Sequence, residues 1–472
     1  FYANNALVNT GELVFREVET GEEALALRAY AGEGFLEFRY ALPEDSYELG
    51  FTITTRGLEG VIASQTTFLN LQWGVNMPSL EKSRDFENRY TGVYYRSAGG
   101  SVENLSVSGN EREEPPVKVK WVAFKQQFFS SILVVDSPCN AVVASTISND
   151  PGFLKEARAE LSLPYEGRAE ERYEMRFFFG PNSFPVLEAC GDDLDFTELV
   201  DLGWKGVAWI NRYLVIPMFH FLERNVTLNY GLIIFLLTLI IKMCLFPLTY
   251  KSYLSQAKMR VLRPQVEEIN KRIPADKAGE RQRATMTLYR QAKVSPMGGC
   301  LPMLVQFPFL VALFYFFPGA IELRQQGFLW ATDLASYDSI LDLPFRVPGY
   351  GSHVSLFCLL MTVTNILYTV MNQRNQPMND QMKSMKYVMY LMPVIFLFVF
   401  NDYSSGLSYY YFISLLITII QMWAIRRVVD DAKLLKEIER AKLRPVKPSK
   451  FQERLVAAQK EQERRRRAKL KK

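Results

Sequence analysis

Short runs of β-forming residues alternate with turn-forming residues across the first 200 positions. The runs FLEFRY, YELGFTI, VKVKWV and YEMRF, at 35–40, 47–53, 117–122 and 173–177, are β-branched or aromatic and often alternate with polar positions. Gly, Pro, Asn and Asp separate the runs, as at 149–152. This pattern predicts an antiparallel, all-β sandwich over residues 1–200. With no Gly-rich phosphate loop and no Ser/His/Asp set, we expect a structural or docking domain, and a sugar- or peptide-binding groove is the alternative.

Five apolar stretches follow in the second half of the chain. They lie at 229–249, 296–318, 353–372, 387–401 and 407–425. About 20 helical residues cross the ~30 Å hydrocarbon core of a bilayer. The last two stretches are short, and only a tight hairpin fits at 401–406. The pattern predicts a multidomain chain, in which the β domain precedes an α-helical membrane domain of five spans at 229–427. The shortness of 387–401 suggests a locally thinned bilayer.

Charge separates the two halves and sets the orientation of the spans. Residues 1–200 carry 17 Lys/Arg against 31 Asp/Glu, a net charge of −14, whereas residues 201–472 carry 38 against 19, a net charge of +19. The basic segments 250–295, 373–386 and the C-terminal tail are therefore expected in the cytoplasm, and residues 1–200 outside. An acidic domain needs a targeting segment to reach that side, and the chain starts at Phe1, so we expect a further segment upstream.

Two flanking segments suit the membrane surface. Residues 201–228 mix aromatic and aliphatic residues with Lys205, Arg212 and Arg224, which is typical of an amphipathic helix in the interface. Within 250–295, the stretches 253–272 and 276–293 predict a basic helical hairpin, separated at Pro274, with an apolar stripe at Met259, Leu262, Val266 and Ile269. The hairpin is either a plain solvated element near anionic lipid or a lever that contacts incoming protein.

The tail, 428–472, ends in the run RRRRAKLKK. Blocks of like charge usually form solvated arms. Such an arm can also bind phosphates through counterion release. We expect ribosomal RNA as its partner, with membrane lipids as the alternative, and no specific DNA binding.

Lys242 is the most informative residue because it lies inside the first apolar stretch. A lysine at the centre of a bilayer costs about 2.5–3.5 kcal/mol on insertion scales, so we expect it to face a polar cavity. The alternative is a lysine that merely snorkels to the interface. Other polar positions recur at helical spacing: Thr238, Gln306, Asn365, Tyr411, Ser414 and Thr418. Such stripes can be glue between helices, but with Lys242 they favour a shared hydrated groove.

Metal and cofactor chemistry find little support in the chain. The five cysteines, at 139, 190, 244, 300 and 358, show no metal-ligand spacing, and His220 and His353 are the only histidines. No ATP-binding or cofactor motif is present. We therefore expect no cofactor, no disulfide framework and no enzyme active site.

A set of motifs resembles the YidC/Oxa/Alb family of membrane protein insertases, in its bacterial form. In order along the chain these are FPLT at 246–249, QAKMR at 256–260, Pro264, SPMGGCLP at 295–302, QFP at 306–308, ELR at 322–324, MPVIF at 392–396 and SGL at 405–407. Gly180-Pro181 and 201–204 (DLGW) look like the end of the family's periplasmic β-supersandwich.

The resemblance implies a multi-pass protein of the bacterial inner membrane, with a periplasmic N-terminal domain, a cytoplasmic C-terminus and a positively charged groove. Lys242 stands where the family usually has arginine, which keeps the charge but loses the planar guanidinium. The implied activity is to take nascent or newly made proteins into the groove and to release their apolar segments into lipid. The general secretion translocon is a candidate partner.

A small-molecule transporter is the alternative function. It is disfavoured because no inverted repeat of spans is seen. A membrane-embedded enzyme is disfavoured as well, because the chain lacks a nucleophile–base set.

Overall fold

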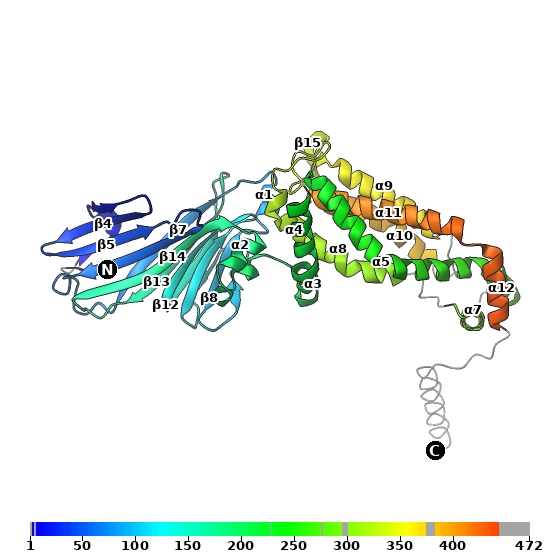
Figure 1. Cartoon of the computed structure of the whole chain (residues 1–472), viewed down its shortest axis with the longest axis horizontal. Coiled ribbons are helices and arrows are strands. Elements are labelled where there is room, and N and C mark those ends of the chain that lie inside the picture. Colours follow the sequence, from blue (N-terminus) through cyan, green and yellow to red (C-terminus); the bar gives the residue numbers. More distant parts are fainter. Residues whose placement is uncertain are drawn as a thin grey trace, which may run out of the picture. The chain divides into compact units, whose positions relative to one another are not determined.

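The computed structural model of the chain describes residues 2–3, 6–226, 228–274, 277–294, 301–373 and 383–442. Strands occupy most of the first 181 residues, and helices dominate the remainder (Figure 1). The chain divides into two compact units. The first comprises the residues up to Ile234 with Val311–Leu359 and Leu397–Tyr409, and the second comprises Phe235–Leu310, Leu360–Phe396 and the residues from Tyr410 onward.

The strand domain is antiparallel throughout its recorded pairs. Its strands are β1 (Tyr2–Ala3), β2 (Ala6–Leu7), β3 (Arg16–Thr20), β4 (Ala24–Ala31), β5 (Gly34–Ala41), β6 (Glu48–Arg56), β7 (Phe68–Pro78), β8 (Gly92–Ser97), β9 (Val102–Asn104), β10 (Glu111–Glu113), β11 (Val119–Lys125), β12 (Phe129–Ile147), β13 (Phe153–Pro164) and β14 (Glu170–Pro181). The main order is β3-β4-β5-β6-β14-β12-β11-β8-β9. The short 3₁₀ turn η1 (Thr10–Glu12) precedes β3, and α1 (Arg84–Glu87) precedes β8.

β12 joins two layers because its 19 residues pair with different neighbours along their length. Its first half, Phe129–Val135, pairs with β14 and β11, and its second half, Asn140–Ile147, pairs with β13. β13 in turn pairs with β7. The apolar side chains of the two layers meet in one core, where Trp73 of β7 stacks on Phe124 of β11 with ring centroids 4.0 Å apart. The predicted sandwich therefore forms by one strand passing from sheet to sheet.

The outer face of β11 and β12 is buried as well. Trp121 and Ile132 pack against the segment after the strands, which holds α2 (Phe184–Ala189), η2 (Asp192–Leu194) and η3 (Phe196–Leu199). The Trp121 Nε1–H donates to the backbone oxygen of Leu194 over 2.8 Å. Because successive strand residues point to opposite faces, Val122 and Phe124 enter the sandwich while Trp121 and Ala123 face this segment.

Helices follow in the order α3 (Lys205–Ile210), the π-helical turn η4 (Asn211–Val215), α4 (Ile216–Asn225), α5 (Tyr230–Val261), α6 (Arg263–Arg272), α7 (Ala278–Gln291), α8 (Leu301–Gly319), α9 (Leu356–Gln373), α10 (Lys383–Phe400), α11 (Ser405–Val428) and α12 (Asp431–Lys442). Between α8 and α9 lie the turn η7 (Ile321–Leu323) and the hairpin of β15 (Leu341–Val347) with β16 (Gly351–Val354). No secondary structure was predicted for this segment between the second and third apolar stretches.

Two helices, α5 and α11, are long and apolar enough to cross a membrane by themselves. Three shorter apolar helices occupy Leu304–Gly319, Leu356–Asn372 and Val388–Phe400 among the residues that the structure describes. Each predicted stretch therefore contains a helix. The expectation of a short last stretch was wrong for α11, which has 24 residues. The fourth stretch is short as expected, because the apolar part of α10 is Val388–Phe400. A thinned bilayer around it stays a prediction.

The helical hairpin at 250–295 differs from its predicted outline. The chain stays helical from the first span to Val261 and breaks at Leu262, so that Pro264 sits in the first turn of α6 instead of kinking a longer helix. Proline is tolerated there because the first-turn N–H groups have no intrahelical partner. The predicted stripe is buried or half-buried, and Met259, Leu262 and Val266 pack with Leu288 and Tyr289 of α7.

α12 closes the same cluster through Ile438, which is 1% exposed. The first part of the predicted basic arm is thus a packed helix, which the charge pattern had hidden. The run of arginines near the C-terminus lies outside the described residues.

The ELR motif at 322–324 contacts the strand domain. Arg324 Nε lies 2.9 Å from Glu81 Oε1, and both side chains are largely buried. The Ser183 hydroxyl donates to Glu322 over 3.0 Å, and the Gln127 amide donates to the Pro318 carbonyl over 2.8 Å. Burial raises the pKa of Glu81, and Arg324 opposes this shift. The motif therefore ties the end of α8 to the strands within one compact unit.

Candidate functional site

A polar cluster surrounds Lys242 in the second compact unit. α5 is apolar along its first five turns except for Thr238 and Lys242, which are four residues apart and so lie on one face. Both are buried, at 0% and 5% exposure. Lysine is almost never fully buried without a partner, so the contacts of its amine decide what this site can do.

Two helices, α8 and α11, supply the partners of Lys242. Its Nζ donates to Gln306 Oε1 of α8 over 2.9 Å and to Thr418 Oγ1 of α11 over 2.7 Å. Gln306 Nε2 donates in turn to Ser414 Oγ over 2.9 Å, and the Thr418 hydroxyl donates to the Ser414 backbone oxygen. Both acceptors of the lysine are neutral. Among the described residues, two of the three ammonium N–H donors have recorded partners.

The remaining predicted residues are Asn365, Tyr411 and Thr238. Asn365 Nδ2 of α9 approaches the Tyr411 hydroxyl of α11 at 3.5 Å, the limit of a hydrogen bond. No contact is recorded that joins this pair to Lys242 among the residues described. The structure thus brings Lys242, Gln306, Ser414 and Thr418 together and gives Asn365 and Tyr411 as a second pair. Thr238 is buried on the Lys242 face of α5.

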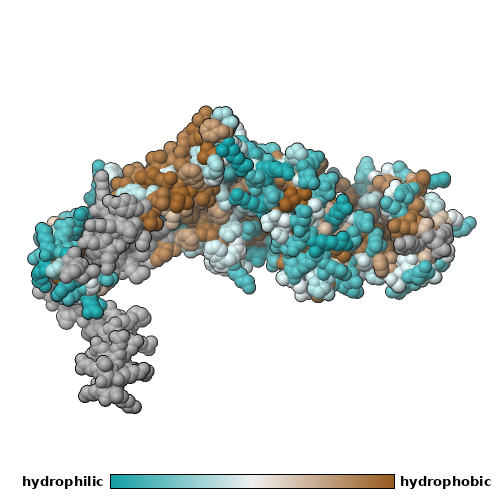
Figure 2. Space-filling model, turned by 180° about the vertical axis from the view of Figure 1, so that it is seen from behind, coloured by the Kyte–Doolittle hydropathy of each residue, from teal (hydrophilic) through white to brown (hydrophobic). Residues whose placement is uncertain are grey.

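Exposed apolar side chains cover the helices of the same unit. On the face in Figure 2, hydrophobic residues form a broad surface over the helical region, while the strand domain is mainly hydrophilic. Side chains at least 36% exposed come from all five apolar helices: Ile240 and Met243, Leu304 and Phe307, Val363 and Leu367, Leu391 and Ile395, and Ile420 and Trp423. Soluble proteins rarely expose apolar patches of this extent. The surface fits contact with lipid.

A buried polar knot at the start of α9 was missed in the sequence. Asp338 is 2% exposed, and its carboxylate accepts hydrogen bonds from the Ser355 hydroxyl, the backbone N–H groups of Leu356 and Phe357, and Trp330 Nε1. Ser355 caps α9, because its hydroxyl also accepts from the Cys358 N–H over 3.1 Å. A carboxylate at a helix N-terminus accepts hydrogen bonds from the free N–H groups there, and its negative charge interacts favourably with the helix dipole.

The turn between α10 and α11 is fixed in a similar way. Asn401 is 0% exposed; its side chain donates to the backbone oxygens of Tyr350 and His353 and accepts from the Ser355 N–H. Its own carbonyl lies 2.9 Å from His353 Nε2. The predicted tight hairpin at 401–406 thus forms. Its turn-forming residues did not indicate that the segment at 350–355 would bond to it.

No group of three or more His, Cys, Asp or Glu side chains is arranged to hold a metal ion within the described residues. Cys139, Cys190, Cys244 and Cys358 are free thiols.

Known proteins match this chain along almost its whole length. Residues 221–432 match the family model of the 60Kd inner membrane protein, and residues 9–217 match the model of the YidC periplasmic domain. The membrane protein insertase YidC of Parabacteroides distasonis is 46% identical over 98% of this chain and 75% of its own length. Those of Bacteroides fragilis and Porphyromonas gingivalis are each 42% identical over 98% of this chain, and over 77% and 76% of their own lengths.

Likeness to solved structures is weak. A putative aldose 1-epimerase from Escherichia coli K12 matches at 10% identity over 35% of this chain and 68% of its own, with a TM-score of 0.25, too low to bear on fold or function.

The two family models and the identity to named insertases carry the classification, and the sequence resemblance is thereby confirmed. The chain is an inner membrane protein with a periplasmic domain, acts without enzymatic chemistry and has nascent membrane proteins as its substrates. It belongs to the YidC family of membrane protein insertases.

Proposed function

We propose that the Lys242 cluster, defined as Lys242, Gln306, Ser414 and Thr418, is the polar groove in which this insertase receives its client. The observation that carries the proposal is a buried lysine whose recorded partners are neutral hydroxyl and amide groups from two other helices. A lysine that only snorkelled would place its amine at the interface. This amine instead lies in the middle of α5 and is enclosed by α8 and α11.

The cluster lowers the cost of bringing a polar chain end into the bilayer. An amide or hydroxyl that loses water without a new hydrogen bond costs roughly 1–3 kcal/mol in proteins. Gln306, Ser414 and Thr418 replace those lost hydrogen bonds, and Lys242 adds a cation for carboxylates or carbonyls of the client. Because these groups already bond to one another, the client must displace internal hydrogen bonds to bind. Thr238, Asn365 and Tyr411 extend the polar surface.

The exposed apolar surface receives the client's hydrophobic segment. We infer five spans, formed by α5, α8, α9, α10 and α11, because each carries exposed apolar side chains of the kind that lipid solvates. Basic loops place 250–295 and the C-terminus in the cytoplasm. The segment α3–η4–α4 then lies at the periplasmic membrane surface. Partitioning into lipid against α8 and α11 drives release, and no cofactor is required.

The basic C-terminal arm is a candidate for bringing the nascent client to the insertase. We infer that Lys460–Lys472, outside the described residues, binds the ribosome, with anionic lipid as its other polyanionic surface and the translocon as a candidate partner at the membrane. Deletion of these residues is expected to weaken co-sedimentation with ribosomes in the same way as raised salt, because both remove phosphate contacts. An unchanged ribosome-bound fraction at low salt would refute the ribosome assignment.

Cysteine labelling tests whether the groove admits water. In a chain whose five native cysteines are replaced, Gln306→Cys and Thr238→Cys are expected to react with a water-soluble maleimide, faster from the cytoplasmic side. Gln306→Cys should react first, since Gln306 is only partly buried and Thr238 is fully buried. The thiolate is the reactive form, and a thiol in lipid does not ionise.

Ile240→Cys and Val363→Cys are the matched controls because both side chains are exposed on the apolar surface, at 36% and 62%. They are expected to stay inert in membranes. Equal, slow labelling at all four positions would mean that the polar residues only join helices and that no aqueous groove exists.

A further inference from the structure

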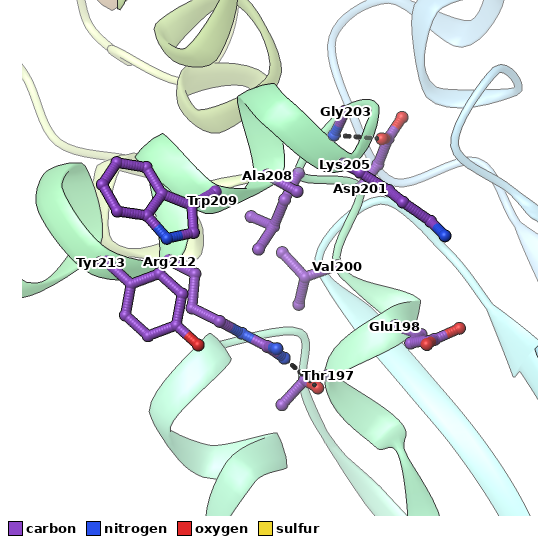
Figure 3. Close-up of a pocket in the computed structure, with 11 residues that line it drawn as sticks. Thr197, Glu198, Val200, Asp201, Gly203, Lys205, Ala208, Trp209, Arg212 and Tyr213 are labelled. Carbon is purple, nitrogen blue, oxygen red and sulfur yellow. Dashed lines mark hydrogen bonds between the residues drawn. The ribbon is translucent and has the colours of Figure 1, made fainter.

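A cavity of about 520 Å³ lies between the end of the strand domain and the first helical turns after it (Figure 3). Residues 197–203 form one wall, and residues 205–213 form the other. All of them belong to the first compact unit. The volume lies within the range of small-molecule sites, and nothing in the insertion mechanism uses this cavity.

The cavity lies close to the first span in the sequence. α4 ends at Asn225 and α5 begins at Tyr230, so the helical segment lies only a few residues before the first span. Trp209 and Tyr213 at the rim are each 62% exposed, with ring centroids 5.8 Å apart. Tryptophan and tyrosine favour the level of the headgroups.

The charged side chains of the lining cancel in pairs. Arg212 and Lys205 contribute two positive charges, and Glu198 and Asp201 contribute two negative charges. In Figure 3, Arg212 extends past Tyr213 toward Thr197, whereas Glu198 and Asp201 lie on the other side of Val200. Lys205 extends toward Asp201 on the carboxylate side, so the Arg212 side of the cavity is positive and the opposite side has a net negative charge (Figure 3). A zwitterionic ligand matches this arrangement better than an anionic one, which would meet two carboxylates.

Arg212 is held in place by the backbone. The N–H of Ile216 bonds to the carbonyl of Asn211, five residues earlier, so the helix makes one π turn at the cavity. Such π turns are rare in proteins, and those that occur are often found at functional sites. Asn211 is 0% exposed and donates to the backbone oxygens of Ala312 and Leu202, which fixes the turn. The Arg212 guanidinium donates to the neutral Thr197 hydroxyl over 2.9 Å and lies 5.2 Å from the centroid of the Phe184 ring; no carboxylate is paired with it among the described residues.

We propose that this cavity binds the headgroup of a phosphatidylethanolamine from the outer leaflet. Arg212 takes the phosphate, since guanidinium pairs with phosphate through two parallel hydrogen bonds. Glu198 and Asp201 accept hydrogen bonds from the primary ammonium, which a choline headgroup cannot donate. The rim aromatics hold the glycerol end at the interface. The inference rests on the proposed placement of α3–η4–α4 at the periplasmic surface and adds a lipid site distinct from the client groove.

Native mass spectrometry of the purified full chain tests this inference. The protein is exchanged into micelles with equal amounts of phosphatidylethanolamine, phosphatidylcholine and phosphatidylglycerol, and the retained lipids are counted. The unaltered chain should retain phosphatidylethanolamine preferentially. Arg212→Gln should lower that retention roughly tenfold, the effect of losing a hydrogen-bonded charge. Arg224→Gln, which removes an exposed cation of the same segment outside the cavity, should leave it unchanged.

Glu198→Gln provides a second variant that leaves the Arg212–Thr197 bond in place. It should shift the preference from phosphatidylethanolamine toward phosphatidylglycerol, because a positive cavity favours an anionic headgroup. Equal retention by Arg212→Gln and Arg224→Gln, or displacement of the lipid by millimolar inorganic phosphate, would overturn the assignment. The readout needs no client protein, so its failure is separate from a failure of the proposed groove.

Discussion

Replacement of Lys242 by glutamate is expected to abolish membrane insertion, whereas Lys242→Arg retains it. Lys242 donates to Gln306 Oε1 and Thr418 Oγ1. A carboxylate at this position has no proton to donate, so it meets the glutamine oxygen without a hydrogen bond. An unpaired charge at the centre of a bilayer costs roughly 2.5–3.5 kcal/mol, and it now repels acidic client ends as well. Arginine keeps the charge and the donors. We expect at least a tenfold loss of inserted client for Lys242→Glu.

Growth of cells depleted of their own insertase, together with protease protection of a radiolabelled client, measures this effect. Lys251→Glu is the matched control, since Lys251 lies on the same helix and is exposed. It reverses the same charge outside the cluster and should insert client normally. Equal insertion by Lys242→Glu and Lys242→Arg would show that the lysine only anchors the helix at the interface.

The positions of the apolar helices and of the residues around Lys242 followed from the sequence because a bilayer imposes strong constraints. An apolar run of sufficient length must bury its backbone polar groups in a helix. Any lysine inside such a run then requires polar neighbours, and helical spacing limits which residues those are. Gln306, Ser414 and Thr418 were expected on those grounds, and each lies in the hydrogen-bond network of Lys242.

Elements governed by long-range packing were harder to foresee. The continuation of α5 to Val261 and the docking of α12 through Ile438 depend on an apolar cluster drawn from separate helices. Basic residues around those apolar positions suggested solvated segments instead. The passage of β12 between two sheets likewise depends on which strands pair, and residue alternation within a strand does not encode its neighbours.

Asp338 illustrates the same limit at a single residue. In the sequence it is one of four acids between the second and third apolar stretches, at 319–352, and nothing in that position indicates a structural role. In the structure its carboxylate caps α9, a helix that begins 18 residues later. Only the fold of the intervening β15–β16 hairpin brings the acid to that helix end.

The central claim is that a client passes the Lys242 cluster on its way into lipid. A photoreactive amino acid at Gln306 tests this most directly, because the position borders the cluster and leaves Lys242 in place. The same probe at Val363, on the apolar surface and 62% exposed, serves as the matched control. Ribosome-bound client chains of increasing length are presented to the full chain in membrane vesicles, and crosslinked products are followed by size.

We predict that crosslinks from position 306 appear first, with the hydrophilic end of the shorter chains, and that Lys242→Glu removes them. Crosslinks from position 363 should come later, with the apolar segment. If position 306 never contacts the client, or if its crosslinks are unchanged by Lys242→Glu, the client takes another route and the cluster is not the groove.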